Sequence, residues 1–159
     1  MIGRLAAVVA LGLANPAGAE GVCVDPGPWE GAGPVVFQAV DALAPEFFDP
    51  SEPPTAAAVE LEPDILQTGG AGLAGTAVGA LTVEGTAVCI RHRPEWLGLR
   101  LENGGDAPAV ARVVIATGDG ALTARLPEVA GGKHVYVLLR ASRPIAGLPA
   151  SAFELMSAK

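Results

Sequence analysis

Apolar and polar residues alternate in four short runs in the second half of the chain, with the period of a β-strand. Successive side chains of a strand point to opposite faces, so each run has one apolar face to bury. The inward-facing residues would be Leu97, Leu99 and Leu101; Ala111, Val113 and Ile115; Leu122, Ala124 and Leu126; and Val135, Val137 and Leu139. The pattern predicts four strands.

Turn residues separate these runs. They are Asn103-Gly104-Gly105-Asp106, Gly118-Asp119-Gly120 and Gly131-Gly132. Gly and Asn adopt the positive φ that tight hairpin turns need. The segment Thr86–Arg140 is therefore predicted to be an antiparallel meander that forms half of a sandwich or barrel.

The first half of the chain has weaker strand signals. In Pro34–Val40, Val36 and Val40 would share one face, with Val35, Phe37 and Ala39 on the other. The other strand candidates are Val22–Val24, Ala56–Glu62, Leu73–Val83, Thr86–His92 and Ser151–Met156, with a turn at Glu84-Gly85. The chain is thus expected to be an all-β antiparallel sandwich.

A long connection occupies Asp41–Thr55, where four prolines and four acidic residues interrupt the strand pattern. A helical turn is expected near Asp41–Ala44. Connections of this length in a compact domain are often functional. The one apolar feature is Phe47-Phe48, which would either pack beneath the connection or be displayed to a partner.

The first 19 residues have the features of a secretory signal peptide. One arginine, Arg4, precedes the apolar run Leu5–Ala14, and Ala17-Gly18-Ala19 provides a small-residue cleavage site. Residues 20–159 are then expected to be a single domain in the periplasm or outside the cell. The run is half the length that a membrane anchor needs, and no later segment is long and apolar enough to span a bilayer, so no integral membrane segment is expected in that domain.

Two cysteines, Cys23 and Cys89, follow the predicted signal peptide. An even, minimal count in an exported chain favours one disulfide between them. The alternative is a pair of free or metal-binding thiols.

Charge is distributed unevenly along the chain, which has a net charge of −7. Eleven acidic residues and no Lys or Arg lie between Glu20 and Ile90, whereas nine basic and six acidic residues follow. An acidic chain repels phosphates, so a nucleic-acid partner is not expected. The uneven charge fits either two complementary halves of one fold or an acidic surface for a basic partner.

The densest cluster of cations and aromatics is formed by Arg91, Arg93 and Arg100 beside Trp96. It would be either a solvated strand edge with a cation–π contact or a contact site for an anion or glycan. Together with Phe47 and Phe48, these residues are the candidate partner-binding residues.

No catalytic constellation is recognisable, and no cofactor is expected. Serines fall in predicted loops or near the terminus, and no G-x-S-x-G motif occurs. Cys89, His92, His134 and Met156 match the residue types of a blue-copper site, but their order differs from that of cupredoxins. His92 and His134 are therefore kept as a subordinate metal hypothesis, and a disulfide at Cys89 would exclude it.

The segment Leu99–Arg140, with its turn Leu-Glu-Asn-Gly-Gly-Asp-Ala-Pro-Ala, resembles the immunoglobulin-like and fibronectin-type modules of bacterial envelope proteins. In those modules an N-x-G turn often joins two strands, and a Gly-rich turn precedes a final Val-rich strand. The resemblance implies a sandwich fold and extracytoplasmic work, and it transfers no functional residue.

These observations favour a non-catalytic exported binding or accessory module of the bacterial cell envelope. Its partner would be another envelope protein or a cell-surface component. The alternatives are a small extracytoplasmic copper carrier, and a secreted inhibitor that presents the connection at 41–55.

Overall fold

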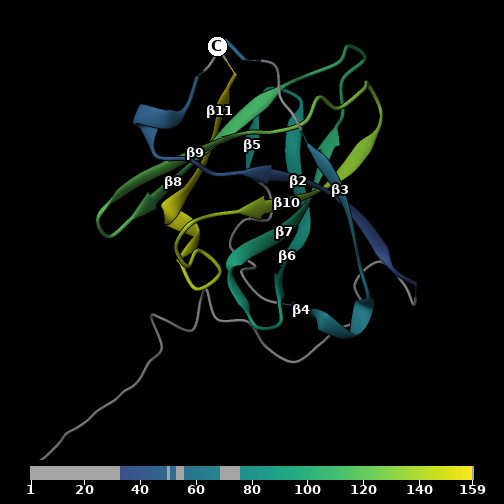
Figure 1. Ribbon diagram of the computed structural model, residues 1–159. Coiled ribbons are helices and arrows are strands. Elements are labelled where there is room, and N and C mark those ends of the chain that lie inside the picture. Colours follow the sequence, from purple (N-terminus) through teal and green to yellow (C-terminus); the bar gives the residue numbers. More distant parts are fainter. Residues whose placement is uncertain (1–32, 50, 53–55, 69–75, 159) are drawn as a thin grey trace, which may run out of the picture.

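The computed structural model describes residues 33–49, 51–52, 56–68 and 76–158, apart from the side chains of 85 and 86, and this part of the chain is all-β (Figure 1). Its strands are β2 (Val35–Asp41), β3 (Ala57–Leu61), β4 (Leu66–Thr68), β5 (Ala77–Val78), β6 (Leu81–Ile90), β7 (Arg93–Asn103), β8 (Ala111–Thr117), β9 (Gly120–Arg125), β10 (His134–Arg140) and β11 (Phe153–Ser157). Short 3-10 turns occur at η2 (Pro45–Phe47), η3 (Pro63–Ile65) and η5 (Ala150–Ala152).

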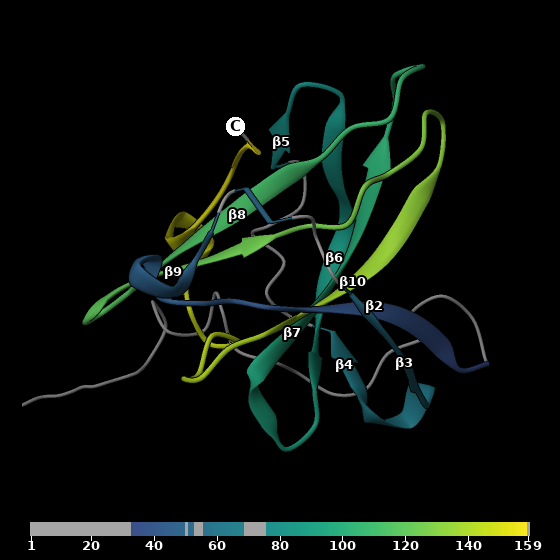
Figure 2. The same ribbon diagram turned by 45° about the horizontal axis from the view of Figure 1, so that its top comes forward.

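The strands form two sheets, which face each other in both views of the molecule (Figures 1 and 2). The larger sheet has seven strands in the order β3-β2-β10-β7-β6-β4, with β5 also paired to β6. The smaller sheet has three strands in the order β11-β8-β9. Two sheets with apolar inner faces fit the predicted sandwich.

The predicted meander is wrong, although its four strands lie where the alternation places them. β7 pairs with β6 and β10 in the large sheet, while β8 pairs with β9 and β11 in the small one. Of the three predicted turns, Gly118-Asp119-Gly120 joins neighbouring strands. The connections 104–110 and 126–133 instead cross between the sheets, because they are too long to be tight hairpins.

The prediction of a wholly antiparallel fold also needs correction. β2 runs parallel to β10, with Gln38 opposite Val137 and Asp41 opposite Arg140. Ninety-two residues separate the end of β2 at Asp41 from the start of β10 at His134, so no local pattern indicates this pairing. All other pairs among the described strands are antiparallel.

The large sheet is curled rather than flat. β3 and β4 lie at its opposite edges, yet the chain from Leu61 to Leu66 joins them directly. Six strands side by side would separate the edges by about 24 Å, whereas five residue steps reach at most about 18 Å. The sheet must therefore bend around one of its faces, and the Arg91 amide, which donates to the Ile65 carbonyl at 2.8 Å, ties η3 to the end of β6.

The main core lies between the two sheets. It is aliphatic, with Phe153 as its one aromatic residue, and it includes the predicted inward-facing residues of all four runs. Ile145, from the connection between β10 and β11, is fully buried in the same core. The strand alternation thus assigned the buried face correctly.

A second, smaller core fills the concave side of the large sheet. Its buried members come from β2, β4, β6 and β10, with η3, β3 and Trp96 packed around them. Phe37 is completely buried there and lies edge-on to Tyr136, at 6.2 Å between ring centroids. It lies over Gly98 of β7, where an added Cβ would be 2.8 Å from both Phe37 Cε2 and Val88 Cγ2. The second core therefore needs glycine at this position.

Asn103, the fully buried last residue of β7, holds the two crossing connections together. Its Nδ2 donates to the carbonyls of Ala107 and Val129 at 2.8 and 2.9 Å, and its Oδ1 accepts from the Gly105 amide at 2.8 Å. These bonds satisfy the side-chain amide in the interior, where an unpaired polar group costs about 1–3 kcal/mol. The predicted N-x-G turn is thus the start of a connection between the two sheets, and the Asn103 side chain holds that connection in place.

Two local predictions fail in the first half of the chain. The expected turn at Glu84-Gly85 is an irregularity inside the continuous strand β6, where the register to β7 shifts between Glu84 and Val88. The hairpin turn is at Gly79-Ala80 instead, and Gly79 has a φ of 59°. The helical turn expected near Asp41–Ala44 occurs at Pro45–Phe47, because proline is favoured in the first positions of a helical turn.

Several sequence predictions fall on residues outside the described part. They are the signal peptide at 1–19, the strand Val22–Val24, and Cys23, so the disulfide to Cys89 stays a prediction. Cys89 itself is buried in the main core. Within the described residues, no helix has the length and apolar character needed to cross a membrane.

Replacing Gly98 by alanine tests the close contact of Phe37 with β7. We expect Gly98→Ala to lower the free energy of unfolding by about 1–3 kcal/mol, because the added methyl group overpacks the second core. Gly118→Ala is the control, since a Cβ there meets nothing within 4 Å. Chemical denaturation of both variants measures the difference, and equal stabilities would contradict the packing.

Candidate functional site

A surface cleft of about 510 Å³ opens where the end of β2 meets the end of β10. Its described lining consists of Asp41, Ala42, Leu43, Ala44, Phe47, Arg140, Ala141, Ser142 and Arg143. We call this the Phe47 cleft. Its volume lies within the range of about 300–1,000 Å³ that is usual for ligand pockets.

Backbone hydrogen bonds fix both walls of the Phe47 cleft. The Ala42 amide donates to the Arg140 carbonyl at 2.7 Å, which continues the parallel pairing. Leu43 then leaves the large sheet and exchanges two backbone bonds with Thr123 of β9, at 2.8 and 2.7 Å. On the other wall, the Ala141 amide donates to the Glu95 carbonyl at 2.9 Å. The cleft is therefore preformed by the sheets.

The apolar part of the cleft is displayed to solvent. Phe47 is 73% exposed and Leu43 is 39% exposed. Pro45 opens the single turn η2, and the Phe47 amide donates to the Ala44 carbonyl at 2.9 Å, which holds the backbone of Phe47 at the cleft. Phe48 is half-buried. The two predicted aromatics therefore differ, with Phe47 displayed and Phe48 partly covered.

Arg140 is held by one weak ion pair. Its Nε donates to Asp41 Oδ1 at 3.2 Å, across the parallel pair of strands. Both side chains are partly exposed, so the pair contributes about 0–1 kcal/mol to stability. Within the described part of the chain, its two Nη atoms have no hydrogen-bond acceptor.

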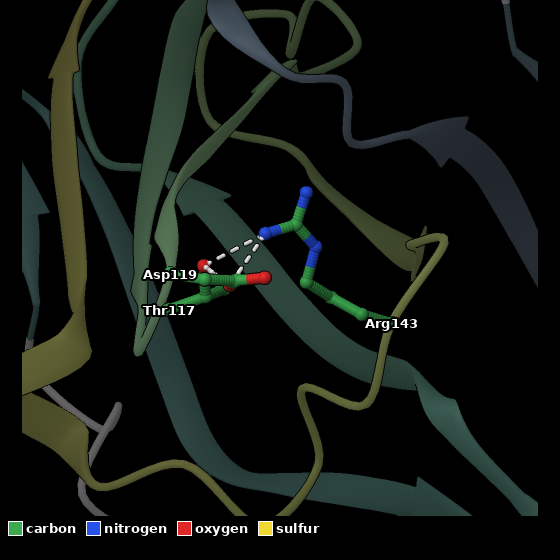
Figure 3. Close-up of polar contacts among 3 residues, drawn as sticks. All are labelled: Thr117, Asp119 and Arg143. Atoms are coloured by element: carbon green, nitrogen blue, oxygen red, sulfur yellow. Dashed lines mark hydrogen bonds and ion pairs between the residues drawn. The ribbon is translucent and has the colours of Figure 1, made fainter.

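Arg143 is fixed by two acceptors on the β8–β9 turn (Figure 3). Its Nη1 donates to Asp119 Oδ1 at 2.7 Å and to Thr117 Oγ1 at 3.1 Å, while Thr117 Oγ1 also donates to Asp119 Oδ1 at 3.0 Å. The Thr117 hydrogen bond, the Arg143 hydrogen bond and the Arg143 charge together lower the pKa of Asp119 below 3.8. We call the contacts of Arg143 with Thr117 and Asp119 the Arg143 latch. These contacts leave Arg143 Nη2 and Nε without an acceptor among the described residues.

The three arginines of the predicted cation and aromatic cluster contact other residues of this chain. Arg93 lies over the Trp96 ring at 4.7 Å and pairs with Glu95 at 3.8 Å. Arg91 Nη2 donates to the Asp64 carbonyl at 2.7 Å. Arg100 lies four residues further along β7, on the same face as Trp96, and pairs with Glu102 at 3.7 Å. The structure therefore separates Arg100 from the other two arginines.

The two histidines lie at opposite ends of β7. His92 is in the β6–β7 turn, where its φ of 66° suits the turn geometry, and His134 is opposite Glu102 near the other end. His134 also contacts Tyr136 edge-on, at 5.3 Å between ring centroids. Met156 belongs to the other sheet. Among the described residues, no three His, Cys, Asp or Glu side chains cluster as metal ligands would.

The sequence prediction missed Leu43, Arg140 and Arg143 as site residues. Arg140 ends a predicted strand and Arg143 lies in a predicted loop, so neither has a distinctive local signal. Their common site depends on the parallel pairing of β2 with β10 and on the crossing of Leu43 to β9. The lining offers guanidinium donors, two exposed apolar side chains and the hydroxyl of Ser142, which suits binding.

The lowered pKa of Asp119 predicts a pH dependence of the latch. Because the folded-state pKa is lowered, the stabilisation is present above pH 3.8 and is lost as the pH falls through the folded-state pKa. We expect carboxyl-carbon NMR to show Asp119 titrating below 3.8. Arg143→Gln should raise that pKa, whereas Arg93→Gln should leave it unchanged, because Arg93 contacts Trp96 and Glu95 and is not among the groups that shift Asp119. An unaltered Asp119 titration in Arg143→Gln would contradict the latch.

In comparisons with known proteins, no family model, no curated protein and no solved structure matches the chain. The resemblance of Leu99–Arg140 to immunoglobulin-like and fibronectin-type modules accordingly stays a prediction. The geometry of the Phe47 cleft is thus the basis on which a function is proposed.

Proposed function

We propose that the protein is a non-catalytic binding module of the bacterial cell envelope, with an immunoglobulin-like sandwich fold, and that its partner binds at the Phe47 cleft. The partner would be another envelope protein or a cell-surface component. The observation that supports the site is the 73% exposure of Phe47 at the edge of a preformed cleft.

An aromatic ring exposed to this degree loses hydrophobic stabilisation in the free protein. Its removal from water by a partner is favourable, at about 25 cal/mol per Å² of apolar surface. Aromatic and arginine side chains are also the residues that dominate binding energy in protein interfaces. The cleft combines both types, because Arg140 and Arg143 line it beside Phe47.

A binding role also suits the chemistry of the lining. Nucleophilic catalysis needs a base within hydrogen-bond reach of the nucleophile. Ser142 is the one hydroxyl of the described lining, and neither His92 nor His134 is part of that lining. The arginines are fixed hydrogen-bond donors, which orient a ligand rather than transfer protons.

Export and the disulfide belong to the same proposal, because the basic start, apolar run and small-residue site of residues 1–19 favour secretion. We expect the protein recovered from the periplasm or medium to begin at Glu20. When it is denatured without reductant, neither Cys23 nor Cys89 should react with an alkylating reagent. Mass spectrometry measures both properties, and two labelled cysteines would disprove the bridge.

Replacing Phe47 by alanine tests the binding site. We expect Phe47→Ala to weaken the capture of the envelope partner about tenfold or more, as for an interface hot spot. Its melting temperature should stay close to that of the parent, because substitutions at exposed positions usually change stability by less than about 0.5 kcal/mol. Quantitative mass spectrometry after cross-linking to an envelope fraction measures the capture.

Val36→Ala is the matched control, since Val36 is 54% exposed on β2 but does not belong to the described lining of the cleft. It should capture the same partner as the parent protein does. Equal capture by Phe47→Ala and the parent would show that the cleft is not the binding site.

A further inference from the structure

We infer that the Phe47 cleft recognises a polypeptide segment in which a carboxylate lies next to an apolar side chain. This inference rests on the proposed function, and it names the chemistry of the partner. It is supported by the unused hydrogen-bond donors of the two arginines and by the exposed apolar residues of the same lining.

The described lining of the cleft has two arginines and one aspartate, which gives +2 − 1 = +1, and Asp119 pairs with Arg143 from outside the lining and balances this excess. The cleft therefore lacks the acidic excess of the whole chain, whose net charge is −7. The preference for an anionic group comes from the hydrogen-bond donors that the two aspartates leave unused on Arg140 and Arg143.

The arginines have unused donors suited to a carboxylate. Asp41 engages the Nε of Arg140, and Asp119 and Thr117 engage the Nη1 of Arg143. Among the described residues, the remaining N–H groups of both side chains have no acceptor. A guanidinium edge binds a carboxylate through two parallel hydrogen bonds. The two aspartates hold the arginines in place and leave an edge of each for a ligand.

The exposed apolar residues indicate that the ligand is more than a small anion. Phe47 and Leu43 are 73% and 39% exposed, and both belong to the same described lining as the two arginines. A free inorganic anion would leave both in water. A cleft of about 510 Å³ has room for several side chains, so a polypeptide can place a carboxylate at the arginines and an apolar group on Phe47.

Two short peptides that differ in one group test the inference. We take acetyl-Ala-Phe-Glu-Ala-amide and its counterpart with Gln in place of Glu, and follow amide NMR shifts of the full mature protein during titration. The Glu peptide should shift the amides of Leu43, Phe47 and Ser142. Its Kd should be about tenfold lower than that of the Gln peptide, because hydrogen bonds to a charged group are stronger than those to a neutral one.

Substitution of the arginines assigns the donors. Arg140→Gln and Arg143→Gln should each raise the Kd of the Glu peptide about tenfold and leave that of the Gln peptide unchanged. Arg93→Gln is the matched control, because Arg93 is not part of the described lining of the cleft and its guanidinium lies over the Trp96 ring. Two arginine variants are used because Arg143 also latches the β8–β9 turn, whereas Arg140 does not.

The other outcomes would overturn the inference in distinguishable ways. Equal binding of both peptides at the cleft would remove the carboxylate requirement and leave the cleft as the partner site. Equal shifts with sodium phosphate would assign a plain anion site and overturn the polypeptide requirement. If neither peptide shifts the cleft amides, the inference is wrong, while the Phe47→Ala capture experiment decides the proposed function separately.

Discussion

β2 lies parallel to β10 with Asp41 opposite Arg140, and most of the architecture depends on this pairing. It places Phe37 on the concave face of the large sheet, over Gly98, where the second core forms. It also directs the chain after Asp41 toward the small sheet, so that Leu43 pairs with Thr123 at the edge of β9. The Phe47 cleft is the space between this crossing segment and the end of β10. An uncovered edge strand can pair with a strand of another chain. The bridge from Leu43 to Thr123 covers part of the edge of β9.

Some of the basic residues in the second half of the chain interact with acidic residues of the first half. Arg140 pairs with Asp41 of the acidic half, and the charge of Arg125 helps the Ser51 hydrogen bonds to lower the pKa of Asp49. The other ion pairs described here, such as Arg143 with Asp119, lie within the basic half. These pairs are largely exposed, so water screens their attraction and they add little to stability. Stability therefore comes from the two apolar cores. The arginines of the cleft are held in position, while some of their N–H groups have no acceptor among the described residues.

Much of the fold follows from local sequence patterns. The period-two alternation located β7, β8, β9 and β10 and identified their buried faces, because one face of each strand must be apolar whichever strands become its neighbours. The two faces of β2 were also assigned correctly, with Val40 in the main core and Phe37 in the second one. The sequence likewise singled out the pair Phe47-Phe48 among prolines and acids, but it did not decide which of the two rings is exposed.

Tertiary structure alone decided which strands pair and what surrounds Phe47. Alternation is the same for a strand in either sheet, so it could not show that β7 and β8 belong to different sheets. The parallel contact of β2 with β10 joins segments whose sequences have no local reason to meet, and it is what brings Asp41, Arg140 and Phe47 to one cleft. Arg143 joins them because Asp119 and Thr117 hold it from another sheet. The alternation of apolar and polar residues determined the class of fold and its buried faces, while long-range pairing determined the site.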